Sequence, residues 1–184
     1  MLEVAYKNIN AAPLFQSFYA RPALTVAREL IGKCLIRAHA DGTHTCWPIT
    51  EVEAYTGAQD LACHGRMGRT QRNAVMFGPA GHWYLYFIYG IHWMLNIVTD
   101  QPEIPAAVLI RGAGPADGPG KLTRALGLDR ELNGLAATPH AGLWIAECGV
   151  RVPRRQVRRT PRIGVDYAGD WAKKPYRWVW DARN

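Results

Sequence analysis

The segment ITEVEAY, residues 49–55, begins the stretch that decides the fold. Read as a β-strand, it directs alternate side chains to opposite faces, so Glu51 and Glu53 share one face, about 7 Å apart along the backbone. The same face is expected to carry Ile49 and Tyr55. Two carboxylates beside an aromatic ring on a partly buried face cost free energy, which indicates a functional site. The alternative is that both carboxylates only pair with arginines on a solvated strand face.

An aromatic hairpin is predicted further along the chain, where residues 82–99 read HWYLYFIYGIHWMLNIVT. Two apolar runs separated by Tyr89-Gly90 are typical of antiparallel strands joined by a turn. Taken alone, these aromatic side chains favour a core over a base-stacking surface, because strands are rich in aromatics anyway. Asn96 is a polar residue inside the second run, and a bond to a neighbouring backbone group would account for it.

A long loop, residues 57–81, separates the carboxylate strand from the hairpin and is rich in Gly, Arg and polar residues. A helical turn is expected within it over residues 60–64. A loop of this length in a small domain is usually functional. It contains His64, although a single histidine is more often a hydrogen-bonded structural residue.

The flanking segments predict further strands and short helices. Residues 22–31 have the apolar spacing of a helix. Asp41-Gly42 is a strong hairpin signal, so residues 33–38 and 43–55 are predicted to pair. Further elements are expected in this order: a strand over 106–110 that ends at Arg111, a short helix over 119–126, and strands over 143–146 and 176–180.

Length and charge set limits on domain number and partner. The 184 residues suffice for one domain, which we place at residues 18–184, after an N-terminal arm at residues 1–17. The formal net charge of +7 favours a polyanionic partner. Six arginines lie close together, at positions 151, 154, 155, 158, 159 and 162. A solvated surface is the first explanation of this run, and contact with phosphates is the second.

The four cysteines, Cys34, Cys46, Cys63 and Cys148, show no CxxC spacing and are expected to be reduced, buried thiols. No apolar run approaches the roughly 20 residues of a membrane span, and residues 1–13 lack the pattern of a signal peptide. We therefore expect an intracellular protein without a membrane partner, cytoplasmic in a bacterium and nuclear in a eukaryote.

The sequence excludes several kinds of chemistry. It has no HExxH motif and no HxE motif with a distant PCxxC, so zinc hydrolases and zinc deaminases are not indicated. Ser17 is the one serine, and it has no GxSxG setting. Carboxylate chemistry beside aromatic rings on a basic protein remains. Composition and spacing alone thus indicate a basic, nucleic-acid-binding globular domain with a candidate carboxylate site.

Five motifs occur in one order: EVEAY, GAQDLACH, RMGRTQRNAVMF, WYLYFIYGIHWMLNIV and VLIR. In that order they resemble the alkyladenine (3-methyladenine) DNA glycosylase family, which is distinct from the helix-hairpin-helix glycosylases. The resemblance extends to FYARPALTVARELIGKCLIR before them and to GPGKLTRALGL and TPRIGVDYAGDWAKKPYRW after them, so it covers nearly the whole chain. RTQRN departs from the family's TPRN form, and residues 151–159 match no motif of the family.

The resemblance implies an α+β, β-rich fold: a single compact domain with an open, curved antiparallel sheet or barrel, short flanking helices and a protruding aromatic hairpin. It implies a monofunctional hydrolase that flips 3-methyladenine, 7-methylguanine, hypoxanthine or ethenoadenine out of double-stranded DNA. The glycosidic bond is then cut to leave an abasic site. No cofactor and no metal are implied, and the protein is expected to act as a monomer.

By position in the motifs, the resemblance also implies roles for individual residues. Glu53 would be the general base that activates water, and Arg111 and the backbone carbonyl of Ile163 would hold that water. The residues that would line the base pocket are Tyr55, His64, Tyr86 and Asn96. Tyr89 would fill the gap that the flipped base leaves. The alternative from another class is a non-catalytic nucleic-acid-binding module that uses the same aromatic and arginine side chains.

Overall fold

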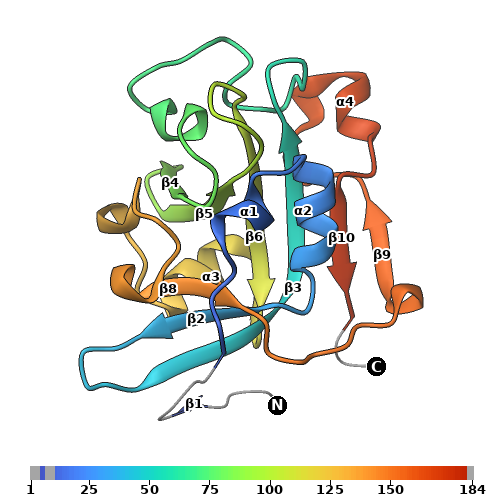
Figure 1. The fold of residues 1–184 in the computed structure, drawn as a ribbon. Helices are drawn as coiled ribbons and strands as arrows, with labels where there is room; N and C mark the ends of the chain where they lie inside the picture. Colours follow the sequence, from blue (N-terminus) through green and yellow to red (C-terminus); the bar gives the residue numbers. More distant parts are fainter. Residues whose placement is uncertain (1–4, 7–10, 182–184) are drawn as a thin grey trace.

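The longest strand, β3 (His44–Thr56), is the one around which the other strands are arranged (Figure 1). Its first half pairs with β1 (Ala5–Tyr6) and β2 (Cys34–Ala38). Its second half pairs with β6 (Ala106–Ala113) on one side and β10 (Arg177–Trp180) on the other. The remaining strands extend the sheet: β4 (Trp83–Ile88), β5 (His92–Val98), β7 (Ala116–Asp117), β8 (Leu143–Ala146) and β9 (Val157–Thr160).

The computed structural model describes residues 5–6 and 11–181. Within that part, all strand pairings are antiparallel, which confirms the prediction of a β-rich α+β fold with an open antiparallel sheet. Of the expected N-terminal arm, residues 1–4 and 7–10 lie outside the described residues, as do residues 182–184 of the expected domain. The Leu14 N–H donates to the carbonyl of Ile145 at 2.8 Å, so this part of the arm lies against β8.

The helices are few and short, as predicted. The longest is α2 (Ala23–Leu30), which agrees with the helix expected over residues 22–31. The other α-helices are α1 (Gln16–Tyr19), α3 (Pro119–Ala125) and α4 (Asp170–Lys173). Single 3₁₀ turns occur at η1 (Ala74–Phe77), η2 (Arg130–Leu132), η3 (Pro139–Ala141), η4 (Arg154–Gln156) and η5 (Asp166–Ala168). None of the helices in the described segments has the length and apolar character needed to cross a membrane.

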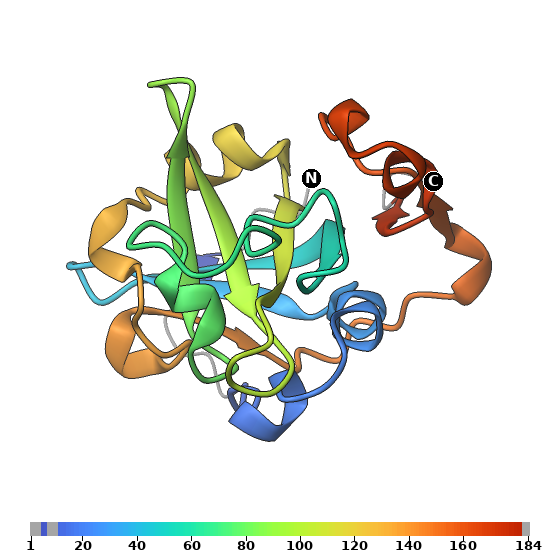
Figure 2. The same ribbon diagram turned by 90° about the horizontal axis from the view of Figure 1, so that it is seen from above.

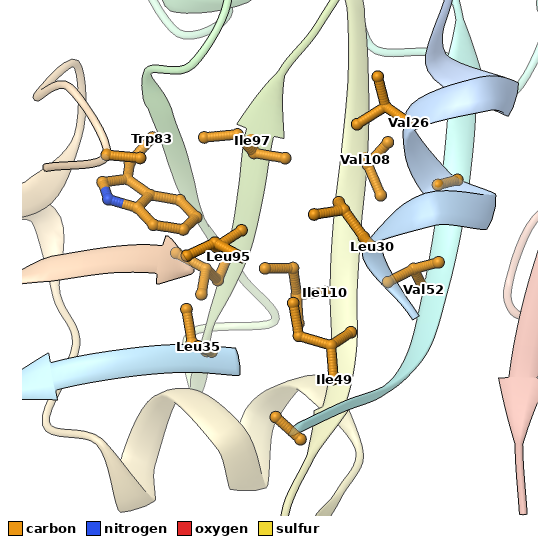
Figure 3. Packing of buried hydrophobic residues seen from close by; sticks show 14 of the residues in the cluster. Val26, Leu30, Leu35, Ile49, Val52, Trp83, Leu95, Ile97, Val108 and Ile110 are labelled. Atoms are coloured by element: carbon orange, nitrogen blue, oxygen red, sulfur yellow. The ribbon is translucent and has the colours of Figure 1, made fainter. Parts of the chain in front are cut away.

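The main hydrophobic core lies between α2 and one face of the sheet (Figure 3). Val26 and Leu30 of α2 pack against Val52 of β3 and Ile110 of β6, and all four side chains are fully buried. Burial of each such side chain stabilises the fold by roughly 1.5–3 kcal/mol. Because core residues occupy this face of β3, the alternate side chains of the strand must point to the other face.

The register of β3 against β6 shifts on both sides of Glu51. The pairing leaves one extra residue in β3, at Thr50, and one extra residue in β6, at Arg111. A bulge of this kind bends its strand and re-aims a side chain. Ile49 therefore packs in the core with Val52, and the expectation that it shares a face with the carboxylates was wrong.

The predicted turn at Asp41-Gly42 joins β2 to β3, as expected. The Asp41 carboxylate accepts hydrogen bonds from the Thr43 N–H at 2.9 Å and from the Thr43 hydroxyl at 2.6 Å. Gly42 has a φ of +80°, in the left-handed region that glycine adopts readily. This turn returns the chain into β3, so that the carboxylate strand starts in register with β2.

β4 and β5 pair in antiparallel fashion from Trp83 opposite Ile97 to Ile88 opposite His92. Figure 2 shows the connected ends of these two strands rising beyond the neighbouring part of the sheet. The Trp83 indole N–H donates to the carbonyl of Leu143 at 3.0 Å, which anchors the other end of the pair in the core.

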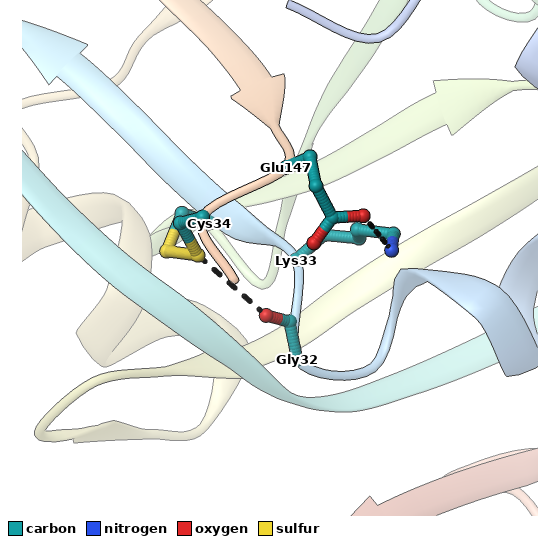
Figure 4. Close-up of a disulfide and its surroundings, with 5 residues drawn as sticks. Gly32, Lys33, Cys34 and Glu147 are labelled. Atoms are coloured by element: carbon teal, nitrogen blue, oxygen red, sulfur yellow. Dashed lines mark hydrogen bonds and ion pairs between the residues drawn. A yellow bond between two sulfur atoms is a disulfide. The ribbon is translucent and has the colours of Figure 1, made fainter. Parts of the chain in front are cut away.

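Two of the four cysteines form a disulfide, between Cys34 of β2 and Cys148 in the segment after β8 (Figure 4). The expectation of four reduced thiols was therefore wrong for these two, because their sequence spacing does not reveal that β2 and β8 are neighbours. Cys46 and Cys63 are free and buried. The adjacent residues Lys33 and Glu147 form an ion pair that joins the same two segments.

Reduction should lower the free energy of unfolding of the native chain by about 2–4 kcal/mol, because the bond restricts the unfolded chain across a separation of 114 residues. Urea unfolding with and without reductant measures the difference. Cys148→Ala should unfold at the same urea concentration in both conditions. Cys46→Ala, which alters a free thiol in the same cluster, should keep the dependence on reductant. Identical unfolding of the native chain in both conditions would contradict the bond.

Candidate active site

Glu53 is a fully buried carboxylate at the centre of the site. Its Oε1 accepts a hydrogen bond from the Ile163 backbone N–H at 2.8 Å and lies 3.4 Å from Nη1 of Arg111. Its Oε2 accepts a hydrogen bond from the Tyr55 hydroxyl at 2.9 Å. β3 supplies Glu53 and Tyr55, the bulge in β6 supplies Arg111, and the segment after β9 supplies Ile163. Four residues that the sequence predicted as site residues are thus brought together.

Glu51 lies on the same face but has different partners. Its Oε1 accepts hydrogen bonds from Nε of Arg111 and from Nε of Arg177, both at 2.7 Å. Arg111 therefore bridges the two carboxylates, whereas Arg177 of β10 binds Glu51. Pairing with arginines, the alternative considered for both carboxylates, thus describes Glu51 well. Glu53, by contrast, has Arg111 as its one arginine partner among the described residues and is fully buried.

Burial raises the pKa of Glu53 above the ordinary glutamate range. The positive charge of Arg111, the Ile163 N–H and the Tyr55 hydroxyl each favour the ionised form and oppose this rise, and the negative charge of Glu51 adds to it. The net shift is upward. A carboxylate with a raised pKa is a stronger base than a solvated one, which suits it to accept a proton.

A cavity of about 580 Å³ lies in front of Glu53. Its wall is built from aromatic rings of β3, the long loop, β4 and the segment after β9. The aromatic and polar lining residues include Tyr55, His64, Arg72, Tyr84, Tyr86, Tyr89, Asn96, Arg111 and Tyr167. Glu53 lies just behind this wall, because its partners Tyr55, Arg111 and Ile163 all line the cavity. This volume falls within the usual range for a small-molecule site.

His64 packs at the aromatic end of the cavity. Its ring centroid lies 4.4 Å from that of Tyr86, and its Nδ1 lies 3.2 Å from the Tyr84 hydroxyl. Asn73 holds the backbone of this loop, because its Nδ2 donates to the carbonyl of His64 at 2.9 Å. Burial lowers the pKa of His64, and the nearby charge of Arg72 lowers it further. His64 is therefore a neutral ring at pH 7.

Asn96 both bonds to neighbouring backbone groups and lines the cavity. Its Nδ2 donates to the backbone carbonyls of Tyr84 at 3.1 Å and Met94 at 3.3 Å, so the side chain ties the two hairpin strands. The same side chain lines the cavity. These two bonds hold the amide in one orientation at the cavity wall.

Tyr89 lies at the turn between β4 and β5 and is 85% exposed. Its φ of +53° lies in the left-handed region, which is uncommon for a bulky residue. The neighbouring Ile91 is 62% exposed. The end of the hairpin thus presents large apolar side chains to solvent at the mouth of the cavity, and Tyr89 is not part of the core.

The structure also brings in residues that the sequence did not predict. Tyr84 lines the cavity and lies two residues before Tyr86 on β4, so strand alternation gives a signal for it. Arg162 was counted with the surface arginines, but its side chain is fully buried in an ion pair with Asp60. That expectation was wrong for Arg162, because an arginine count does not show which side chain finds a buried partner.

Two further arginines of the run, both in β9, lie on opposite faces of the sheet. In β9, Arg158 lies opposite Val179 of β10, which in turn lies opposite Glu51. Paired residues share a face, so Arg158 is on the carboxylate side. Arg159 lies opposite Trp178, which is buried in the core on the α2 side. The two neighbouring arginines thus face opposite sides of the molecule.

Over residues 5–6 and 11–181, no three His, Cys, Asp or Glu side chains lie close enough together to hold a metal ion.

Comparison of the sequence with known proteins places the chain in a family. The sequence model of the methylpurine-DNA glycosylase (MPG) family matches residues 17–118 and 115–184. A protein of Myxococcus xanthus named "Putative 3-methyladenine DNA glycosylase" is 50% identical over 181 residues, covering 92% of this chain and 91% of the relative. Relatives with the same name are 43% identical in Methanocella arvoryzae (88% and 89% covered) and 42% identical in Legionella pneumophila (89% and 92% covered). The resemblance seen in the motifs is therefore confirmed, and the chain belongs to the methylpurine-DNA glycosylase family of DNA repair enzymes.

Proposed function

We propose that this DNA glycosylase removes alkylated and deaminated purines from duplex DNA by hydrolysis of the N-glycosidic bond, leaving an abasic site. The substrates would be 3-methyladenine, which is in the relatives' names, and 7-methylguanine, hypoxanthine and ethenoadenine. One observation carries the proposal: the buried carboxylate of Glu53 lies directly behind an aromatic cavity of about 580 Å³. Such a cavity has room for a purine and brings it close to a single carboxylate that can act as a general base.

The purine must leave the base stack to enter this cavity, because a glycosidic bond inside the duplex is out of reach. Unstacking a nucleotide costs a few kcal/mol, which an apolar side chain inserted into the gap can offset. Tyr89 suits this role, because its ring is exposed at the end of the hairpin and borders the cavity. We therefore propose that Tyr89 occupies the space of the flipped nucleotide.

Tyr55, His64 and Tyr86 suit the cavity to a cationic purine. Alkylation at N3 or N7 gives the purine a positive charge, and a cation over an aromatic face gains roughly 0.5–2 kcal/mol. A protonated histidine would repel that charge, but burial lowers the pKa of His64 and keeps it neutral. The alkylated base is also a good leaving group, so one carboxylate suffices.

The hydrolytic step follows from the contacts of Glu53. Among the described residues Oε2 accepts one hydrogen bond, from Tyr55, and a carboxylate oxygen can accept a second, from water. Glu53 takes the proton of that water as its oxygen bonds to C1′ of the deoxyribose. For a purine alkylated at N3 or N7, the glycosidic bond breaks and its electron pair leaves with the purine, which becomes neutral. Hypoxanthine and ethenoadenine start neutral, so each also takes up one proton from solvent as it leaves. Arg111 and the Ile163 carbonyl would orient the water. Among the described residues, no lysine lines the cavity, so we do not expect Schiff-base chemistry or strand cleavage.

Glu53→Gln should lower the rate of purine release by at least about 100-fold and leave binding to abasic DNA intact. The amide keeps the shape, because its oxygen can accept from the Ile163 N–H and its NH₂ can donate to the Tyr55 hydroxyl. Release of free purine from alkylated duplex DNA measures the loss. Glu51→Gln is the matched control and should be milder. A non-catalytic binding module would release no purine even from the native chain, and an active Glu53→Gln beside an inactive Glu51→Gln would overturn the assignment.

Asn96→Ser should raise the excision of undamaged guanine from a negligible level, while release of 3-methyladenine, a cationic purine without a 2-amino group, stays mostly intact. Guanine differs from hypoxanthine by its 2-amino group, and a fixed side chain at that edge excludes it by crowding. Single-turnover excision of guanine and hypoxanthine from matched duplexes tests this. A melting curve is the control, because the variant loses two backbone hydrogen bonds. A uniform loss on all substrates, with no gain on guanine, would leave Asn96 a purely structural role.

Arg158→Ala should reduce the salt dependence of duplex binding by about one phosphate contact, because Arg158 lies on the carboxylate face. Arg159→Ala is the matched control from the neighbouring position. Its side chain lies on the α2 side, so the slope of log Kd against log salt should not change. Equal slopes for both variants and the native chain would make Arg158 an ordinary solvated residue.

A further inference from the structure

We propose that the buried Asp60–Arg162 pair is a positioning device for the site, which sets the Ile163 N–H against Glu53 and fixes Tyr55 at the cavity wall. Neither residue is assigned a role by the motifs that mark the family resemblance. The inference rests on the proposed function, because it takes Glu53 to be the reacting carboxylate.

The pair is completely enclosed and joined at two points. Both side chains are fully buried. Arg162 donates from Nη1 to one Asp60 oxygen at 2.6 Å and from Nη2 to the other at 2.8 Å. Asp60 also accepts the backbone N–H groups of Thr56 at 3.2 Å and Ala62 at 3.0 Å. Two parallel hydrogen bonds fix both the distance and the angle between the Arg162 guanidinium and the Asp60 carboxylate. The end of β3, the long loop and the segment after β9 are therefore fixed to one another.

Arg162 and the residue after it contact three consecutive residues of β3. Nη1 of Arg162 donates to the carbonyl of Ala54 at 2.8 Å, and its guanidinium carbon lies 4.8 Å from the ring centroid of Tyr55. The next residue, Ile163, donates its backbone N–H to Glu53. The guanidinium also lies 5.4 Å from the ring centroid of Tyr176. Placement of Arg162 thus determines where the partners of Glu53 lie.

Arg162 acts through these neighbours and not on a substrate. Its side chain is fully buried and does not line the cavity, whereas Tyr55 and Ile163 do. Tyr55 both lines the cavity and contacts the guanidinium, so the charge of Arg162 supports a ring of the cavity wall. The role is therefore one of positioning.

Stability alone gives little reason for this pair. Burying two charges costs solvation, and an apolar pair of similar volume often stabilises a fold equally well or better. In addition, Nε of Arg162 is buried with no hydrogen-bond partner among the described residues, which adds a further cost. An apolar pair would not place the Ile163 N–H with the same accuracy, which is what a carboxylate acting as a base requires.

Displacement of the Ile163 N–H should change the pKa of Glu53 and thus the pH dependence of the reaction. The groups that face Glu53 are Arg111 from β6, Glu51 and Tyr55 from its own strand, Tyr86 from β4, Arg177 from β10, and Arg162 with the Ile163 N–H from the segment after β9. The Ile163 N–H and the arginine charges favour the ionised form. Loss of the N–H contact should therefore raise the pKa of Glu53, and the rate should begin to fall at a higher pH as the solution is acidified.

The test is the double variant Asp60→Leu with Arg162→Met, which replaces the pair by apolar side chains. Single-turnover release of methylated purines is measured from pH 5 to 9, below the melting temperature. We expect the maximal rate to fall by at least about tenfold and the acidic limb to move up by about one pH unit. A melting curve is recorded for each variant, because the apolar side chains leave the Thr56 and Ala62 N–H groups and the Ala54 carbonyl without these partners. An acidic limb that coincides with that of the native chain would overturn the proposal.

A second variant decides the matter if the double variant does not fold. Arg162→Lys keeps the charge but lacks the fork, so it should show a smaller shift of the acidic limb in the same direction, and an unshifted limb would overturn the proposal. Glu29→Gln is the control, because it breaks an ion pair with Arg21 that lies away from the cavity. Its acidic limb should match that of the native chain, and a shift there would overturn the specificity of the effect. A native chain that releases no purine refutes the proposed function itself, whereas an active native chain with unshifted variants refutes the positioning role alone.

Discussion

The arrangement of the molecule depends on keeping one carboxylate out of water without leaving it unpaired. An isolated buried charge is too costly for a fold to retain, and in practice such a group takes up a proton. Three groups on different parts of the chain oppose protonation of Glu53: the Tyr55 hydroxyl and the Ile163 N–H donate hydrogen bonds to it, and the Arg111 guanidinium forms an ion pair with it. Burial of this carboxylate is therefore offset only when strands β3 and β6 and the segment after β9 are all packed around it.

The paired bulges of β3 and β6 reconcile this site with the core. Regular alternation would carry the side chain of Ile49 to the face of Glu51, away from the core it needs. One extra residue in each strand lets Ile49 pack with Val52, while Arg111 reaches both carboxylates. The irregularity is local, since the pairing of Glu53 with Leu109 and beyond is regular. A bulge next to a reactive group is a common way to aim a side chain that a regular strand would misplace.

Much of the fold and part of the site could be predicted from sequence, because they depend on local patterns. The alternation around Glu51 and Glu53, the Asp41-Gly42 turn and the helix that became α2 are all set by neighbours in the chain. The features that were missed depend on contacts between distant segments. The disulfide of Cys34 needs β8 beside β2, and burial of Arg162 needs Asp60.

The segment after β9 determines when the candidate site forms during folding. Ile163 is 110 residues from Glu53 in sequence, and Arg162 is 102 residues from Asp60. Contacts of such separation form late, because closing a long loop costs entropy before the contact forms. Until β10 pairs with β3, Glu53 lacks the Ile163 N–H, the nearby charge of Arg162 and the burial that raises its pKa. The candidate site would therefore be complete only after β10 has paired with β3 and β9.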